Sequence, residues 1–213
     1  MGWIHSRIGD GVKLSTKLRM ASRKTLTSEP PTFTDIFDRP DGPLAAPWVQ
    51  AAESGTADFG VASGKGVTTR TAGTDLAVAA IVDLGAPVGV VEWDLSAWPK
   101  GPVYSIFRFV DINNFWLVGG TISDGSLVYL FTLEAGAWTV KGVQSGVTWG
   151  AGRRLTVTDD GLVVAVKVDG VSLPGLSASS STFADATKAG IGGNAKHGDL
   201  TDARWSRFHM ELR

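Results

Sequence analysis

The sequence contains no cysteine among its 213 residues, which excludes disulfides, thiolate metal sites and a cysteine nucleophile. No run approaches the roughly 18 uncharged apolar residues that a transmembrane helix needs. The opening Met-Gly-Trp-Ile-His-Ser-Arg lacks the apolar segment of a secretory signal. We therefore expect no membrane partner and no signal peptide, with synthesis and folding in a cytoplasm.

Charge is also scarce, since only 19% of the residues are charged while 43% are apolar. This composition supports a buried core and excludes a disordered chain. The net charge of −1 is unevenly distributed: residues 1–30 hold six basic and two acidic residues, whereas the remainder holds 14 basic and 19 acidic residues. A basic segment on a mildly acidic body favours docking to an acidic surface, with a solvated tail as the alternative. Nucleic acid is not an expected partner, because Trp3 is the only aromatic residue in this segment for stacking.

The first predicted unit, residues 1–32, is a basic N-terminal arm that ends in a proline hinge at Pro30 and Pro31. Residues 15–24 fit a short helix with apolar groups on one side. These few apolar groups cannot form a core, so they need a partner surface, either the rest of the protein or another chain. The residues predicted to contact that surface are Leu14, Lys17, Leu18, Arg19, Arg23 and Lys24.

The second predicted unit, residues 33–213, alternates apolar and polar residues with the period of a β-strand. Leu162, Val164, Val166 and Val168 are expected to face one way, between hairpin signals at Asp159-Asp-Gly161 and Asp169-Gly170. Similar patterns predict strands at 59–70, 75–84, 87–95, 103–112, 115–122, 126–133, 136–144, 152–159, 162–169, 188–193 and 203–212. Strands that recur with Gly and Asp turns predict an all-β, two-sheet antiparallel jelly-roll sandwich.

One stretch of this second unit also carries a resemblance to a known family. Asp35-Ile-Phe-Asp-Arg-Pro-Asp-Gly-Pro-Leu44, followed by Trp48, resembles the opening of concanavalin A-like (laminin-G/glucanase-like) jelly rolls in minor tail proteins of actinobacterial phages. Arg108–Trp116 and Ala203–Phe208 resemble the central and closing strands of the same domains. Ala45 departs from the family pattern, which has glycine there, so a different turn before Trp48 is expected.

The resemblance implies a non-enzymatic virion structural protein made in the host cytoplasm and located on the phage tail or particle surface. Its sandwich would be displayed outward, and its arm would dock to tail or capsid subunits. A homo-oligomer is expected. The alternatives are a capsid decoration protein and a carbohydrate-binding module for a host cell-wall glycan.

Glycoside hydrolysis is the first chemistry to test, because glucanases share this architecture and use paired carboxylates in an E-x-D-x-x-E pattern. Glu92-Trp-Asp94 supplies the first two positions, but Ala97 stands where the second glutamate belongs. Loss of an acid/base group removes proton transfer worth about 10²–10⁴-fold in rate. We therefore predict that the chain is not an enzyme.

Other catalytic patterns are weak. His5, His197 and His209 have no adjacent nucleophile motif. Gly60–Lys65 is one residue short of a phosphate-binding loop and leads into a strand. No cofactor is expected; Ca²⁺ stays an unsupported alternative, for which the oxygen ligands would be Asp159, Asp160, Asp199 and Asp202.

The sequence is rich in tryptophan, with eight residues. Most lie in or beside predicted strands, where large aromatic side chains usually fill a sandwich core. Trp98 and Trp149 lie at strand ends or in loops instead. They are the predicted glycan-stacking residues if the protein binds carbohydrate.

Overall fold

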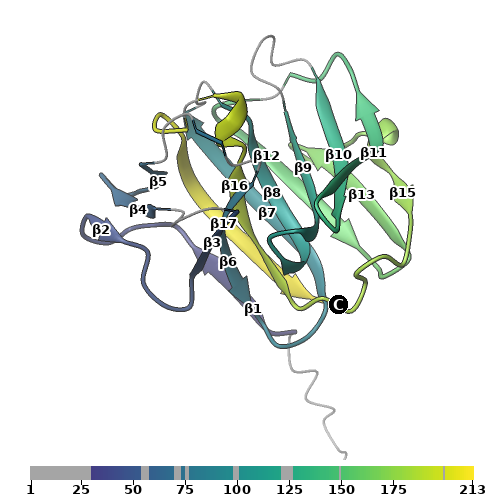
Figure 1. Ribbon diagram of the computed structural model, residues 1–213, viewed down its shortest axis with the longest axis horizontal. Coiled ribbons are helices and arrows are strands. Elements are labelled where there is room, and N and C mark those ends of the chain that lie inside the picture. Colours follow the sequence, from purple (N-terminus) through teal and green to yellow (C-terminus); the bar gives the residue numbers. More distant parts are fainter. Residues whose placement is uncertain are drawn as a thin grey trace, which may run out of the picture.

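The computed structural model describes residues 30–213, except 54–57, 70–72, 75–76, 98–100, 121–126, 149 and 199. These residues form two antiparallel sheets packed face to face (Figure 1). The predicted all-β two-sheet sandwich is confirmed. Within the described ranges, no helix is long and apolar enough to cross a membrane.

The ten-stranded sheet has the order β14-β13-β12-β7-β17-β5-β4-β2, with β1 also paired to β17 and β15 to β13. Its strands are β1 (Thr32–Asp35), β2 (Gly42–Pro43), β4 (Phe59–Ala62), β5 (Lys65–Thr68), β7 (Val88–Ala97), β12 (Arg153–Asp159), β13 (Val163–Val168), β14 (Val171–Ser172), β15 (Ala178–Ser179) and β17 (Arg204–Leu212). Figure 1 shows β17, the last strand, running beside β7 from the first half of the chain. The closing strand thus lies inside the sheet.

The seven-stranded sheet has the order β11-β10-β9-β8-β16-β6-β3. Its strands are β3 (Val49–Ala52), β6 (Val78–Asp83), β8 (Val103–Asp111), β9 (Asn114–Gly120), β10 (Val128–Glu134), β11 (Ala137–Gln144) and β16 (Lys188–Gly193). Two 3-10 helices complete the described elements, η1 (Pro174–Leu176) and η2 (Ala195–His197).

Two sequence predictions about local structure are wrong. The strand expected at 59–70 is a hairpin of β4 and β5, because Ser63 and Gly64 both take positive φ angles (51° and 67°) and reverse the chain. This hairpin also accounts for the phosphate-loop-like sequence there. Leu162 does not face the core with Val164, since it lies in the turn between β12 and β13 and is 67% exposed.

The main core lies between the two sheets. Trp93 and Trp205 come from the ten-stranded sheet and Trp116 from the seven-stranded sheet, and all three side chains are fully buried. A second apolar cluster comes from the seven-stranded sheet and from Ala77, which directly precedes β6. Its residues alternate with those of the main core along β9 and β10, so they face away from the ten-stranded sheet. We call this the outer apolar face; its buried members are Ala77, Ala79, Ile81, Tyr104, Ile106, Phe109, Phe115, Leu117 and Leu133.

The opening motif closes one end of the sandwich. The buried Asp35 carboxylate accepts hydrogen bonds from Arg39 Nη1 (2.8 and 2.9 Å), the Phe37 backbone (2.7 Å) and Trp48 Nε1 (2.8 Å). The Trp48 ring then packs against Phe208 of β17, with ring centroids 5.1 Å apart. The partner of Arg39 is thus Asp35, four residues earlier in the chain.

The turn before Trp48 explains why Ala45 is accepted where glycine was expected. Residues 45–48 form a four-residue turn in which the Trp48 N–H donates to the Ala45 carbonyl (3.2 Å). The Ala46–Pro47 bond in its centre is cis, the arrangement of a type VI turn. Neither alanine takes a positive φ angle in this turn, so glycine is not required.

Arg108 joins the two sheets, and its side chain is only 1% exposed. It sits where the β8–β9 register shifts and reaches across to Asp159 at the end of β12. Its Nε and Nη2 donate to the two Asp159 oxygens (2.7 and 2.6 Å), and Nη1 donates to the Ser180 and Thr182 carbonyls. The guanidinium also lies over the Trp116 ring, 5.2 Å from its centroid.

We predict that Arg108→Met lowers the free energy of unfolding by about 3–5 kcal/mol, because it leaves the Asp159 charge buried without its partner. Urea unfolding measured by tryptophan fluorescence gives the value. Arg153→Met is the matched control, because the Arg153–Asp169 pair is solvent-exposed and such pairs contribute about 0–1 kcal/mol. Equal losses in the two variants would contradict a special role for Arg108.

Candidate functional site

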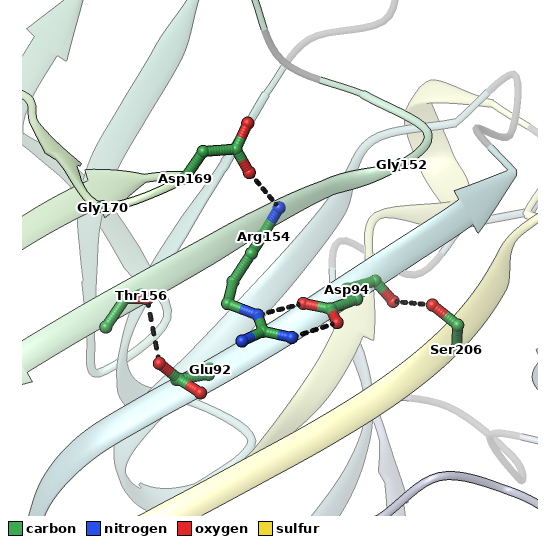
Figure 2. Close-up of a pocket in the computed structure, with 8 residues that line it drawn as sticks. All are labelled: Glu92, Asp94, Gly152, Arg154, Thr156, Asp169, Gly170 and Ser206. Atoms are coloured by element: carbon green, nitrogen blue, oxygen red, sulfur yellow. Dashed lines mark hydrogen bonds and ion pairs between the residues drawn. The ribbon is translucent and has the colours of Figure 1, made fainter.

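A groove of about 570 Å³ crosses the outward face of the ten-stranded sheet. Figure 2 shows its polar lining, which comes from β7, β12, β17 and the turn after β13. The lining residues are Glu92, Asp94, Gly152, Arg154, Thr156, Asp169, Gly170 and Ser206.

Strand alternation brings these polar side chains together. In β7, Glu92 and Asp94 point outward while Val91, Trp93 and Leu95, which alternate with them, enter the core. The pairing with β12 then sets Thr156 opposite Glu92 and Arg154 opposite Asp94. Directly opposite side chains in an antiparallel pair are close enough to bond, so the register itself creates the ionic contacts.

Arg154 and Asp94 form the central ion pair of the groove (Figure 2). Nε and Nη2 of Arg154 each donate to a different Asp94 oxygen at 2.8 Å, a two-pronged geometry that fixes both side chains. The hydrogen bond to Asp94 raises the pKa of Arg154, which keeps it charged. At the rim, Asp169 accepts from the Arg154 backbone (2.9 Å) and from the Arg153 side chain, and both bonds lower the pKa of Asp169.

Glu92 forms the second ionic contact. Its Oε2 accepts from Arg207 Nη1 of β17 (2.7 Å) and its Oε1 from Thr156 Oγ1 (3.3 Å). Partial burial pushes the pKa of Glu92 up, but the hydrogen bond and charge of Arg207, with Arg154 and Thr156, outweigh it. The net result is a lowered pKa and a carboxylate that stays ionised.

This geometry differs from what glycoside hydrolysis requires. A general acid needs a raised pKa, whereas the pKa of Glu92 is lowered, and each oxygen of Glu92 and Asp94 already accepts a hydrogen bond. Ala97, the last residue of β7, supplies no third carboxylate. The groove is therefore equipped with fixed donors and acceptors, which suit recognition of polar groups.

The predicted glycan-stacking residues, Trp98 and Trp149, lie outside the described residues. The described residues beside them meet at one end of the groove. β7 ends at Ala97, one residue before Trp98, and β12 begins at Arg153, which pairs with Leu95 of β7. The described residues that flank Trp98 and Trp149 in the sequence therefore lie at the same end of the polar groove.

The residues predicted to contact a partner through the arm also lie outside the described residues. They are Leu14, Lys17, Leu18, Arg19, Arg23 and Lys24. His5 and Asp199 fall outside as well.

The proposed calcium ligands do not come together as a site. Asp159 is occupied by Arg108, and Asp160 accepts from the Leu162 and Val163 backbones in the following turn. Asp202 is exposed in a separate turn. In the described part of the chain, no group of three or more His, Asp or Glu side chains could hold a metal ion.

Two of the three histidines lie in the described ranges, and both have structural roles. His197 ends η2, where its backbone N–H donates to the Asn194 side chain (3.2 Å). His209 of β17 bonds to Thr34 Oγ1 (2.6 Å) and to Glu211 (2.9 Å), which ties the last strand to β1.

Comparison with known proteins gives similarity in structure only. The sequence matches no protein-family model and no curated protein. A Bacillus licheniformis β-glucanase is similar with a TM-score of 0.59 and 10% identity, over 85% of this chain and 98% of that chain. The carbohydrate-binding module CBM66 from Bacillus subtilis is similar with a TM-score of 0.51 and 17% identity, over 76% of this chain and 92% of that chain.

A third similar structure is LamAcat from Zobellia galactanivorans, with a TM-score of 0.56 and 11% identity over 84% of this chain and 96% of that chain. The fold is a concanavalin A-like jelly roll. At these identities the similarity establishes the fold alone. Both catalytic and non-catalytic proteins share this jelly roll, so the chemistry of the chain has to be argued from its own residues.

The sequence pattern identifies Glu92 and Asp94 as a carboxylate pair but does not reveal the arginines that bind them. Arg154 and Arg207 lie about 60 and 115 residues further along the chain, so only strand pairing reveals the contact. The available signal was the outward alternation of Arg154 and Arg207 in their own strands.

We predict that the pairing of Glu92 makes stability depend on pH. Because the folded pKa lies below the usual value of 4.5, the stabilisation is fully present above pH 4.5 and is lost as pH falls through the folded pKa. Glu92→Gln should therefore reduce the drop in urea midpoint between pH 6 and pH 3.

Glu134→Gln is the control for this experiment, because Glu134 makes a looser ion pair with Lys141 (3.6 Å). It should leave the pH dependence close to that of the unmodified protein. A Glu92→Gln profile that matches the unmodified protein would contradict the assignment of Glu92 as an ion-paired group.

Proposed function

We propose that the chain is a non-enzymatic structural protein of a phage particle, a minor tail protein. In this proposal the jelly roll is displayed on the virion and residues 1–32 dock it to neighbouring subunits. The protein would be made in the host cytoplasm and would contribute to host attachment. A capsid decoration protein is the nearest variant of this proposal, and the copy number per particle distinguishes the two.

The observation that carries the proposal is the role of the opening motif. Asp35, Arg39 and Trp48, the positions on which the resemblance to phage minor tail proteins depends, form the network that closes the sandwich. The motif therefore marks the start of a self-contained scaffold. The ion-paired carboxylates of the groove support a non-enzymatic role, since each of their oxygens already accepts a hydrogen bond within the protein.

We predict that deletion of residues 1–29 leaves a folded sandwich that no longer enters virions. The deletion retains Pro31, whose carbonyl accepts from the Leu212 backbone (3.3 Å), and the whole closing network. Thermal unfolding checks folding, and immunoblotting of purified particles checks incorporation. An intact chain carrying Asp38→Ala, a change at an exposed residue of the body, is the control for incorporation. Normal incorporation of the truncated chain would contradict docking by the arm.

A second function, carbohydrate binding, is favoured by the arrangement of the groove. Fixed carboxylate and guanidinium groups can bond vicinal hydroxyls, and the described residues that flank Trp98 and Trp149 in the sequence lie at one end of the same groove. Aromatic stacking beside convergent polar groups is a common design for small-molecule sites. This function is compatible with the first, because a tail subunit can also bind a host glycan.

We predict that Trp98→Ala or Trp149→Ala weakens binding of a host cell-wall polymer such as arabinogalactan by about tenfold or more, the loss typical of an aromatic anchor. Isothermal titration calorimetry measures it. Tyr129→Ala, a half-buried aromatic residue on the other sheet, is the matched control. A glycan array without any signal would count against carbohydrate binding and would leave the structural role intact.

A further inference from the structure

The outer apolar face of the seven-stranded sheet contrasts with the ionic face of the ten-stranded sheet. An antiparallel sheet with one solvated face normally alternates apolar and polar residues. β6 (Val-Ala-Ala-Ile-Val-Asp) and β9 (Asn-Phe-Trp-Leu-Val-Gly-Gly) are apolar on both faces instead. Strands of this composition are typical of a sheet that is covered on both sides.

Aromatic rings pack edge-on against one another over the part of the outer apolar face that β8, β9, β10 and β11 form. Trp138 lies edge-on to Phe115 and Phe131, with centroids 6.3 and 5.8 Å away, and this packing shields the residues beneath. Its Nε1 is buried and has no acceptor among the described residues. Beside it, Val140 remains 54% exposed and Val143 43% exposed. The half-face therefore has exposed apolar area and an unused donor.

The opposite half of the face holds a cavity of about 260 Å³. Val49, Ala51, Ile81 and Phe109 give it apolar walls, with the polar ends of Asp83 and Lys188 also in the lining. Val49 is 67% exposed, the same fraction as Leu162 on the ten-stranded sheet. An apolar cavity continuous with an apolar face is a site for apolar side chains.

The first described residues pack against the residue that precedes this cavity in the sequence. Pro30 is the first described residue, and Phe33, three residues later, packs against Trp48 with centroids 5.7 Å apart. Trp48 directly precedes Val49. A segment of 29 residues can span roughly 95 Å when extended, whereas seven strands are about 29 Å across. The segment is therefore long enough to span the outer apolar face.

The composition of residues 1–29 suits a segment that covers the outer apolar face. The segment carries Trp3, Ile4, Ile8, Val12, Leu14 and Leu18, which are too few to form a core of their own. With residue 30 it has a balance of +4, against −5 for the rest of the chain. Apolar groups without a core and a charge opposite to that of the body favour this segment as the cover.

We propose that residues 1–29 lie across the outer apolar face and insert apolar side chains beside Val49 and Val140. The inference deepens the docking role proposed for the arm, because it names the surface that receives it. The receiving surface belongs either to the same chain or to a neighbouring copy, and the experiment separates these two.

The absence of native cysteine allows the face to be probed with single thiols in the full chain. Val49→Cys and Val140→Cys are each made with the native arm and with the arm variant Leu14→Asp/Leu18→Asp. Reaction with a maleimide reagent should be about tenfold or more faster with the variant arm, because a covering segment protects the thiol until it opens. A second arm variant, Ile4→Asp/Ile8→Asp, tests contact made by the first part of the segment.

Leu162→Cys is the matched control, since its exposed fraction equals that of Val49 and it lies in the β12–β13 turn of the other sheet. Its reaction rate should not depend on the arm. The proposal is overturned if the rates at both Val49→Cys and Val140→Cys are the same with the native arm and with both arm variants.

A further variant, Leu18→Cys with Val49→Cys, shows which chain supplies the arm. A disulfide between two chains supports both the inference and the docking role. A disulfide within one chain supports the inference and counts against docking of neighbouring subunits by the arm. The two proposals can therefore fail independently.

Discussion

The buried guanidinium of Arg108 holds the two sheets in a fixed relation. It comes from the seven-stranded sheet, while its carboxylate partner, Asp159, comes from the ten-stranded sheet. The segment after β15 contributes the carbonyls of Ser180 and Thr182 to the same group. A buried charge is tolerated only when all its partners are in place. One side chain thus couples the sheets and the connecting segment into a single cooperative unit.

The two sheets then differ in how they meet the exterior. On the ten-stranded sheet, charged residues pair with one another, as Asp94 does with Arg154. That face can therefore be exposed to water without a covering partner. On the seven-stranded sheet, rings and aliphatic groups occupy the equivalent positions. This asymmetry separates a polar surface suited to small hydrophilic ligands from an apolar surface suited to protein segments.

Much of the fold could be predicted from the sequence, because strands such as β12, β13 and β17 alternate clearly, and β12 and β13 end at Gly or Asp turns. Short strands such as β2 and β14 could not, since two residues carry no periodic signal. The β4–β5 hairpin was hidden because its turn residues, Ser63 and Gly64, lie within a continuous strand-like pattern. In the groove, Glu92 and Asp94 were identifiable from their spacing in β7. Their arginine partners were not, because register between distant strands is set by the whole sheet.

The pairing of β1 with β17 also determines how this protein can be combined with others. Thr32 lies opposite Glu211, and the Leu212 N–H donates to the Pro31 carbonyl, so the chain enters and leaves the sandwich at one corner. Sequence attached before residue 31 and after residue 212 therefore emerges from adjacent points. Such a domain can be inserted into a surface loop of another protein without separating the ends of that loop. The jelly roll can thus be transferred between proteins as an inserted domain.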